Sequence, residues 1–507
     1  MKIDKLIQMF RLIAVLGLLL ASVNAVWANS VDEGVVAYRA KDFSKAYDLL
    51  KPAALDGDAR AQFFVGRLYH EGNGAPQDYK KAAKWYRKAS DQGLPIAQNN
   101  LGFLYANGLG VTKNIEIAYK WLNLAAAEGH ERAVQGVQNL RAKMTKQQLA
   151  ETEAKLGWMY HRGWSVEKDL EEAARWYLSA ALRGHPTAQN NLGQLYAKGE
   201  GVEQSFLEAA KWYGIAAAQG HARAQYNVAM LHVNGNQEGV DRDLIVAEAW
   251  LYLATLQGLG EAKKALALLQ SQMSPEESRK ADNRIGVFYQ QGIGVGRDYK
   301  KAADWYRKAA AANYSSAQYN LGLLYHKGLG VTLDESQAME WYLRAAKQGH
   351  AVAQNNVGWL YQKGVRGRQD IEQALTWYKK AAEQNVAGAQ SNIGLLYYLG
   401  LGVEQDYEQA TLWFNKAAEQ GHSKAFETLG RIFFLGHGVD KNQVLAYKWF
   451  SLAVQAGATK AQEGLNIIKP KMSQLEVEEA EQLVRQWRTA HRMVLKLPVR
   501  VTSTPVH

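Results

Sequence analysis

The sequence predicts an all-α protein, a right-handed superhelical solenoid of stacked antiparallel helix pairs. Three observations lead to this prediction. A chain of 507 residues is too long for one ordinary core, 45 glycines accompany only 8 prolines, and a Gly-x-x-Tyr element recurs at a nearly fixed interval. Many glycines with few prolines are typical of a chain of short helices, each of which needs a residue that can end it. A fixed interval indicates a repeat array.

The recurring element defines ten helix pairs. Successive elements stand 36 residues apart, except for two steps of 55 and 57 residues, and a tryptophan follows each element. The repeat glycine, or the residue in its place, is Gly66, Gly102, Gly157, Gly193, Ala229, Gly286, Gly322, Gly358, Gly394 and Gly430. Because ten of the 15 tryptophans follow this spacing, we expect most of them to fill the space between helices.

The copy around Gly102 shows why each element should be a helix pair. In the first helix the small and apolar residues share one face: Ala97, Leu101, Gly102 and Tyr105. Gly108 and Gly110 should end that helix, and Asn114 should cap the next one. In the second helix one face carries Ala118, Trp121 and Ala125. A single pair cannot bury such a face alone, whereas stacked pairs can.

The pattern resembles the Sel1-like repeat family, relatives of the tetratricopeptide repeats. The residues that carry the resemblance are Ala97-Gln98, Leu101-Gly102, Tyr105, Gly108 to Val111, Ala118, Trp121, Ala125-Ala126 and Gly129, and it covers about residues 59–458. The resemblance implies an adaptor or scaffold, as family members typically act in signalling, secretion, quality control and envelope assembly. Some bacterial members are penicillin-binding or hydrolytic proteins with cysteine-stapled repeats, but this chain has no cysteine.

The two long steps divide the array. Extra segments, Ala133 to Thr152 and Ala262 to Arg279, contain helix-start signals at Thr145 and Ser274, and a third such signal, Ser473, follows the last repeat. We interpret each as a long helix, a capped turn and another helix that close one block. The predicted parts are a signal peptide (1–28), N-terminal capping helices (29–58), three repeat arrays with closing helices (59–152, 153–282 and 283–483) and a basic tail (484–507).

The first 28 residues are typical of a secretory signal. Lys2, Lys5 and Arg11 precede an uncharged apolar run from Leu12 to Val23, and small residues precede a cleavage point after Ala28. We therefore expect a periplasmic or secreted protein without a transmembrane span after cleavage. The alternative is an uncleaved anchor, since 17 residues without charge are near the lower limit for a span. Without cysteine the chain cannot be a lipoprotein.

Composition and motifs argue against several chemistries. Of the net charge of +11, +5 lies in residues 484–507 and only +4 in residues 29–483, so the array is nearly balanced and we expect no nucleic-acid partner. The Gly-x-Gly loops lack the Lys-Ser/Thr of a nucleotide site and occupy one repeat position, which favours helix termination. Five histidines directly follow a glycine at the inter-repeat turn, where they could meet the last helix carbonyls: His130, His185, His221, His350 and His422. The sequence predicts no metal, no cofactor and no enzyme activity.

Asparagine recurs two residues before the repeat glycine and is our candidate partner-binding feature: Asn100, Asn191, Asn227, Asn320, Asn356 and Asn392. In the tetratricopeptide relatives the matching position lines the concave groove, and an amide offers both a donor and an acceptor to a peptide. The alternative is that these side chains bridge neighbouring helices within the stack. The basic residues of a carboxylate clamp are not repeated beside them.

The basic tail gives a second candidate surface, with Arg485, Arg488, Arg492 and Lys496. It could contact anionic lipid or polysaccharide, or it could be a capping helix with a disordered end. The leading prediction is a non-enzymatic scaffold of the cell envelope or secreted space that binds proteins or peptides. The alternative is an accessory factor that binds cell-wall glycan or exported polysaccharide, and a hydrolase of the penicillin-binding type ranks third.

Overall fold

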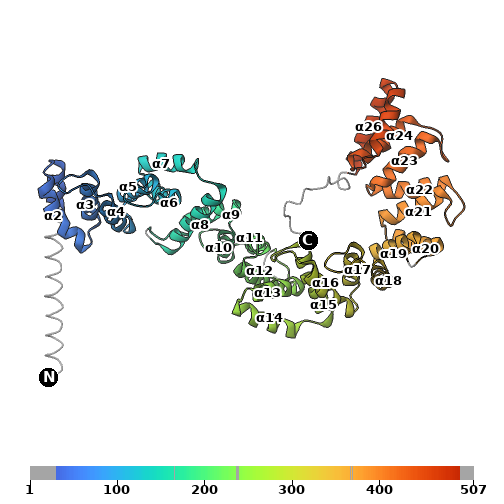
Figure 1. Cartoon of the computed structure of the whole chain (residues 1–507), viewed down its shortest axis with the longest axis horizontal. Coiled ribbons are helices and arrows are strands. Elements are labelled where there is room, and N and C mark those ends of the chain that lie inside the picture. The colour runs from blue at the N-terminus through green and yellow to red at the C-terminus, as the bar shows by residue number, and fades with distance from the viewer. Residues whose placement is uncertain (1–29, 165, 236–238, 366, 368, 492–507) are drawn as a thin grey trace. The chain divides into compact units, whose positions relative to one another are not determined.

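The fold consists of successive helix pairs, as a computed structural model shows (Figure 1). The structure describes residues 30–164, 166–235, 239–365, 367 and 369–491, and within these residues there is no β-sheet. The predicted all-α class is therefore confirmed. The chain forms two compact units, which divide between Gln272 and Met273, with Ile293–Val295 belonging to the first unit. The predicted division into three arrays stays a prediction.

Each repeat contributes a first and a second helix, which pack against each other. The first helices are α3 (Ala59–Glu71), α5 (Pro95–Asn107), α8 (Lys146–Arg162), α10 (Pro186–Lys198), α12 (Ala222–Asn234), α15 (Pro275–Gln291), α17 (Ser315–Lys327), α19 (Ala351–Lys363), α21 (Ala387–Leu399) and α23 (Ser423–Leu435). The second helices are α4 (Tyr79–Asp91), α6 (Ile115–Ala127), α9 (Leu170–Leu182), α11 (Phe206–Ala218), α13 (Leu244–Leu256), α16 (Tyr299–Ala311), α18 (Glu335–Lys347), α20 (Ile371–Glu383), α22 (Tyr407–Glu419) and α24 (Gln443–Gln455).

Local sequence sets the helix ends, as the second repeat shows. Gly108 ends α5 with a φ of 73°, and its N–H donates to the carbonyl of Leu104. Gly110 also has a positive φ, and a Cβ there would lie 2.2 Å from the backbone of Tyr79. The side chain of Asn114 accepts from the N–H of Ile117 and starts α6. The predicted end and start signals are confirmed here.

Three of the five inter-repeat histidines act at the opposite helix end from the one that we expected. The Nδ1 atoms of His185, His221 and His350 each accept from the backbone N–H three residues ahead, at 3.2 Å, and so cap the start of the next first helix. An accepting ring nitrogen is unprotonated, and burial lowers the pKa of His221 and His350, which fits a neutral ring. The expectation that they meet the preceding helix carbonyls was wrong for these three.

The inserted segments form helices, and all three helix-start motifs are capping boxes. The extra helices are α7 (Glu131–Arg141), α14 (Gly260–Gln272) and α25 (Ala461–Ile468), the last followed by the 3₁₀ turn η1 (Lys469–Lys471). Thr145, Ser274 and Ser473 then cap α8, α15 and α26 (Gln474–Ala490), each 17 residues long. The longer helix therefore follows the turn instead of preceding it. The box starts α8 and α15 one turn earlier than the 13-residue first helices.

The core is built around the repeat glycine and the residue that follows the tryptophan. A Cβ on Gly358 would lie 2.7 Å from the ring of Tyr378, which is fully buried. Tyr86, Tyr177, Tyr306, Tyr342 and Phe414 occupy the equivalent buried position in their repeats. Where Ala229 replaces the glycine, the facing residue is the smaller Leu251. The sequence analysis emphasised the tryptophans, but four of them, Trp176, Trp305, Trp341 and Trp413, are only half-buried.

The two ends of the described chain are helical. Residues 30–39, which are helical, and α2 (Phe43–Asp56) precede the first full repeat. At the other end α26 runs through residue 484, so the first residues of the predicted basic tail belong to the closing helix. The predicted signal peptide, 1–28, lies outside the described residues. Among the described helices, none combines the length and apolar character needed to cross a bilayer.

Candidate partner-binding surface

The first helices share a solvent-facing stripe, which we call the ladder face. It consists of the residues two before and one after the repeat glycine, positions −2 and +1, which lie on the same side of a helix because they are three apart. Position −2 holds Phe64, Asn100, Lys155, Asn191, Asn227, Arg284, Asn320, Asn356, Asn392 and Thr428. Position +1 holds Arg67, Phe103, Trp158, Gln194, Met230, Val287, Leu323, Trp359, Leu395 and Arg431. These side chains are half-buried or exposed.

Three of the six predicted asparagines connect neighbouring first helices. The Nδ2 of Asn227 donates to Oδ1 of Asn190 at 3.0 Å, which joins α12 to α10. Asn320 donates in the same way to Asn283 of α15, and Asn392 donates to Asn355 of α19, at 3.0 and 3.1 Å. The acceptor lies 37 residues earlier each time, so the contact recurs with the repeat.

The other three predicted asparagines accept within their own helix. The Oδ1 atoms of Asn100, Asn191 and Asn356 accept from Asn99, Asn190 and Asn355 at 3.2 to 3.4 Å. All six are half-buried, so each keeps access to solvent. The bridging interpretation thus describes Asn227, Asn320 and Asn392. Binding of a partner by any of the six stays a prediction.

Buried glutamines join successive repeats beneath the ladder face, a feature that the sequence analysis missed. In α19 the Nε2 of Gln354 donates to the carbonyl of Ala346 in the preceding second helix, and its Oε1 accepts from Gln384 at 2.8 Å. The same glutamine pair occurs as Gln62 with Gln92, Gln189 with Gln219, Gln225 with Gln257, Gln318 with Gln348 and Gln390 with Gln420. A glutamine recurring four residues before the repeat glycine was the available signal.

The two repeats that follow an inserted helix replace this glutamine pair by an ion pair. In α8, Oε2 of Glu153 accepts from Nε of Arg183 at 2.8 Å, and only 1% of Glu153 is exposed. In α15, Oδ1 of Asp282 accepts from Nζ of Lys308 at 2.7 Å. Burial raises the pKa of Asp282, and the lysine opposes that shift. The same repeats carry a cation, Lys155 or Arg284, at position −2 of the ladder face.

Aromatic side chains enlarge the ladder face at three repeats. Phe103, Trp158 and Trp359 occupy position +1 with 48%, 46% and 38% of their surface exposed. Phe103 stacks on His70 and Trp359 stacks on His326 of the preceding repeat, with ring centroids 6.3 and 5.3 Å apart. Burial lowers the pKa of both histidines, which favours neutral rings in these stacks. Flat apolar surfaces beside amides suit a peptide partner.

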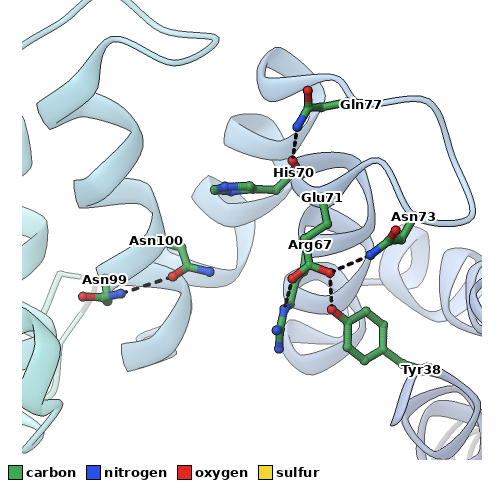
Figure 2. A network of polar contacts seen from close by, with 8 residues as sticks. All are labelled: Tyr38, Arg67, His70, Glu71, Asn73, Gln77, Asn99 and Asn100. Carbon is green, nitrogen blue, oxygen red and sulfur yellow. Dashed lines mark hydrogen bonds and ion pairs between the residues drawn. The ribbon is translucent and has the colours of Figure 1, made fainter. Parts of the chain in front are cut away.

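In the first repeat, position +1 of the ladder face is occupied by Arg67, which is bound to Glu71. Figure 2 shows Glu71 accepting from Tyr38, from Nε of Arg67 and from Asn73, so the cation at position +1 is already paired. The same view shows the ring of His70 extending toward the side of α5 that carries Asn100. The open part of the ladder face in the first unit therefore begins at α5.

The predicted basic tail lies only partly within the described residues. Arg485 and Arg488 lie on α26, where Arg485 is 3.7 Å from Glu481, and Trp487 packs edge-on against Phe426. Arg492 and Lys496 lie outside the described residues. In the described ranges, no three histidine, aspartate or glutamate side chains gather in a way that could hold a metal ion.

Comparison with known families identifies the type of repeat. The Sel1 repeat model matches eleven segments: 34–58, 59–94, 95–130, 150–185, 186–221, 222–259, 279–314, 315–350, 351–386, 387–422 and 429–457. The first of them falls within the predicted N-terminal capping helices. A comparison with curated proteins found no match.

Solved structures of the same repeat type are similar to the chain. A protective antigen present in uropathogenic Escherichia coli strains, with an SLR fold, is 31% identical over 97% of this chain and 99% of that chain, with a TM-score of 0.44. A Sel1 repeat protein from Oxalobacter formigenes is 29% identical over 76% of this chain and 89% of its own, with a TM-score of 0.30.

Proposed function

Because this chain belongs to the Sel1 repeat family, we propose that it is a non-enzymatic scaffold that binds partner proteins or peptides on the ladder face. The repeats indicate a protein–protein interaction scaffold, and Sel1 solenoids are typically non-catalytic. The observation that supports binding on the ladder face is the alternation of half-buried asparagine amides with exposed rings at Phe103, Trp158 and Trp359. Amides can bind a peptide backbone, and rings can bind its side chains.

Site-specific cross-linking tests this proposal. A photo-reactive amino acid is placed in the full chain on the ladder face, at Gln194 in the first unit or Leu323 in the second. Matched positions on second helices, Leu256 and Leu412, are exposed and serve as controls. We expect a protein from an envelope extract to cross-link at a ladder position and not at the controls. No cross-linked protein, or equal yields at the control positions, would contradict the proposal.

We further propose that the protein acts in the periplasm or outside the cell after removal of residues 1–28. Three basic residues followed by the apolar run Leu12 to Val23 support this location. Expression with a C-terminal tag, fractionation and mass spectrometry of the N-terminal peptide test it. The expected product is soluble in the periplasmic or secreted fraction and begins at Asn29. A tagged protein that keeps Met1 and sediments with membranes would indicate an anchor instead.

A further inference from the structure

The first three repeats of the first unit bring indoles and cations together where α6 meets α8. We call this group the tryptophan–cation cluster. Its members are Arg87, Lys120, Trp121, Lys155, Trp158 and Trp164. They come from α4, α6, α8 and the loop after α8. Trp158 is the ladder-face residue of α8.

Two exposed rings form the outer part of the cluster. Trp158 and Trp164 each have 46% of their surface exposed, and their ring centroids are 6.0 Å apart with a tilt of 58° between the planes. Exposed tryptophans that touch each other are uncommon on a surface that binds nothing, because indoles are the largest apolar side chains. Because the two ring planes are tilted, Trp158 and Trp164 form a corner and not one flat surface.

Two cations lie over the ring of Trp121, the buried indole of the cluster. Nζ of Lys120 is 4.1 Å from the ring centre of Trp121 and 5.2 Å from that of Trp164. The guanidinium of Arg87 is 5.2 Å from the ring of Trp121 and donates to the hydroxyl of Tyr105 at 2.8 Å. Two cations therefore share one indole.

These two cations lack an anionic partner. Within the described residues no ion pair joins Arg87 or Lys120 to a carboxylate, although the charge of Asp91 acts on both. Burial, with Arg87 and Lys155 adding to it, lowers the pKa of Lys120 to about 8. An anion bound here would offset the repulsion of the Lys120 ammonium by the charges of Arg87 and Lys155.

The equivalent tryptophan of the second unit lacks this excess of charge. Trp359 also occupies position +1 and also has a lysine, Lys363, 5.1 Å from its ring centre. Lys363 forms an ion pair with Glu335. An exposed tryptophan with a nearby lysine is thus common to both units. Within the cluster Lys155 is also paired, with Glu151 at 3.1 Å, so among the described residues the unpaired positive charge of the cluster is that of Arg87 and Lys120.

We propose that the tryptophan–cation cluster docks an acidic segment of a partner protein that also carries aromatic or proline side chains. Carboxylates would lie against Lys120 and Arg87, and a ring would fit the corner between Trp158 and Trp164. The tilted corner suits one side chain better than a run of sugar rings, which stack on rings aligned along their path. The inference rests on the proposed scaffold function and adds the chemistry of the partner.

Fluorescence anisotropy with the full chain tests the proposal. The probe is a labelled twelve-residue peptide of glutamate, phenylalanine and proline. Comparison probes replace glutamate by lysine, or phenylalanine and proline by glycine, and an oligogalacturonate of equal charge represents acidic glycan. We expect the acidic aromatic peptide to bind at least tenfold more tightly than each of the three comparison probes, and to weaken as salt is raised.

Variants assign the binding to the cluster. Trp158→Ala with Trp164→Ala should weaken the peptide at least tenfold, and Lys120→Gln should weaken it several-fold. Leu256→Ala, at an exposed position on the second helix α13 of the same unit, is the control, with no more than a twofold effect. Circular dichroism checks that each variant is folded, and because the changed rings are half-exposed we expect all of them to fold.

The outcomes separate this inference from the scaffold proposal. An equal loss with Leu256→Ala, equal binding of the lysine peptide, or tighter binding of oligogalacturonate would overturn the inference. If cross-linking at Gln194 or Leu323 captures a partner protein but no acidic peptide binds, the inference fails and the scaffold proposal stands. Peptide binding that depends on Trp158 and Trp164, without cross-linking on the ladder face, supports the cluster and contradicts the wider binding surface.

Discussion

The first helices α8 and α19 hold the same place in their repeats and share a tryptophan on the ladder face, but they differ at two nearby positions. Four before, two before and one after the repeat glycine, α8 has Glu153, Lys155 and Trp158, whereas α19 has Gln354, Asn356 and Trp359. Gln354 needs both of its polar atoms, because it donates to a carbonyl of the preceding second helix and accepts from Gln384.

The inserted helix α7 explains this difference. The residue eight before Glu153 is the capping residue Thr145, not the end of a second helix as at Gln354, so the usual carbonyl acceptor is not supplied. A carboxylate, which only accepts, suits that position and pairs with Arg183. The comparison teaches that the chemistry of a repeat position follows from the element that precedes it.

The largest expected effect comes from breaking the buried contact in each helix. Arg183→Ala leaves the carboxylate of Glu153 buried without its cation and should cost about 3 kcal/mol. Gln384→Ala leaves one amide oxygen of Gln354 without its donor and should cost about 1–2 kcal/mol. Urea unfolding of the full chain, followed by circular dichroism, measures both losses. A larger loss for Gln384→Ala would contradict the comparison.

The repeat glycines should respond alike, because α8 and α19 share this contact. A Cβ on Gly157 or Gly358 would lie 2.6 or 2.7 Å from the ring of Tyr177 or Tyr378. Each change to alanine should therefore destabilise its unit by about 2 kcal/mol. Gly214→Ala is the matched control, since nothing lies within 4 Å of its Cβ, and it should stabilise α11 by about 0.5 kcal/mol. Thermal melts rank the three, and unequal losses at the two tyrosine contacts would show that the units differ there.

Converting the ion pair into the usual glutamine pair should succeed only in part. Glu153→Gln with Arg183→Gln supplies both amides but not the missing carbonyl acceptor, so we expect a net loss of about 1 kcal/mol relative to the parent chain. The double variant should thus be more stable than Arg183→Ala in the same urea series. Stability equal to that of the parent would mean that the inserted helix does not determine the residue at this position.

The smallest expected effect is a pH dependence of binding at Lys120, which lies on α6 beside α8. Lys120 has a pKa of about 8, so its charge is present below that value and is lost as the pH rises through it. A bound carboxylate favours the protonated lysine, and binding of the acidic peptide should weaken about threefold to fivefold between pH 7 and pH 9. Anisotropy titrations at both pH values measure this, and Lys120→Gln should abolish the difference. A parent chain whose affinity is unchanged over this range would contradict the role of Lys120.

Features that depend on a few neighbouring residues could be predicted from the sequence. The glycine ends at Gly108, the cap at Asn114 and the box at Thr145 each involve contacts within one turn, so the signals lie side by side in the chain. The number and order of the helix pairs could also be predicted, because the repeat element recurs at a nearly fixed interval along the sequence. The orientation of His185 did not, because a side chain at a turn can reach either helix.

Contacts between repeats could be predicted only in part. The six asparagines were identified by their recurrence, but their partners, such as Asn190 for Asn227, lie 37 residues away and required the structure. The glutamine pairs were missed because each joins residues 30 or 32 apart that belong to different helices or their caps. The tryptophan–cation cluster was missed because it depends on how the inserted helix places α8 beside α6, which no periodic pattern encodes.

The pairing of Ala229 with Leu251 has a consequence for how such arrays are rearranged in genes. The two residues lie on the first and second helix of one repeat, and they replace the glycine and aromatic ring of most other copies together. A crossover in the loop between α12 and α13 would separate them and set an alanine against a large ring. A crossover at the turn between repeats keeps each pair intact. Viable duplications and deletions should therefore have their junctions at the turns between repeats, such as those at His185, His221 and His350.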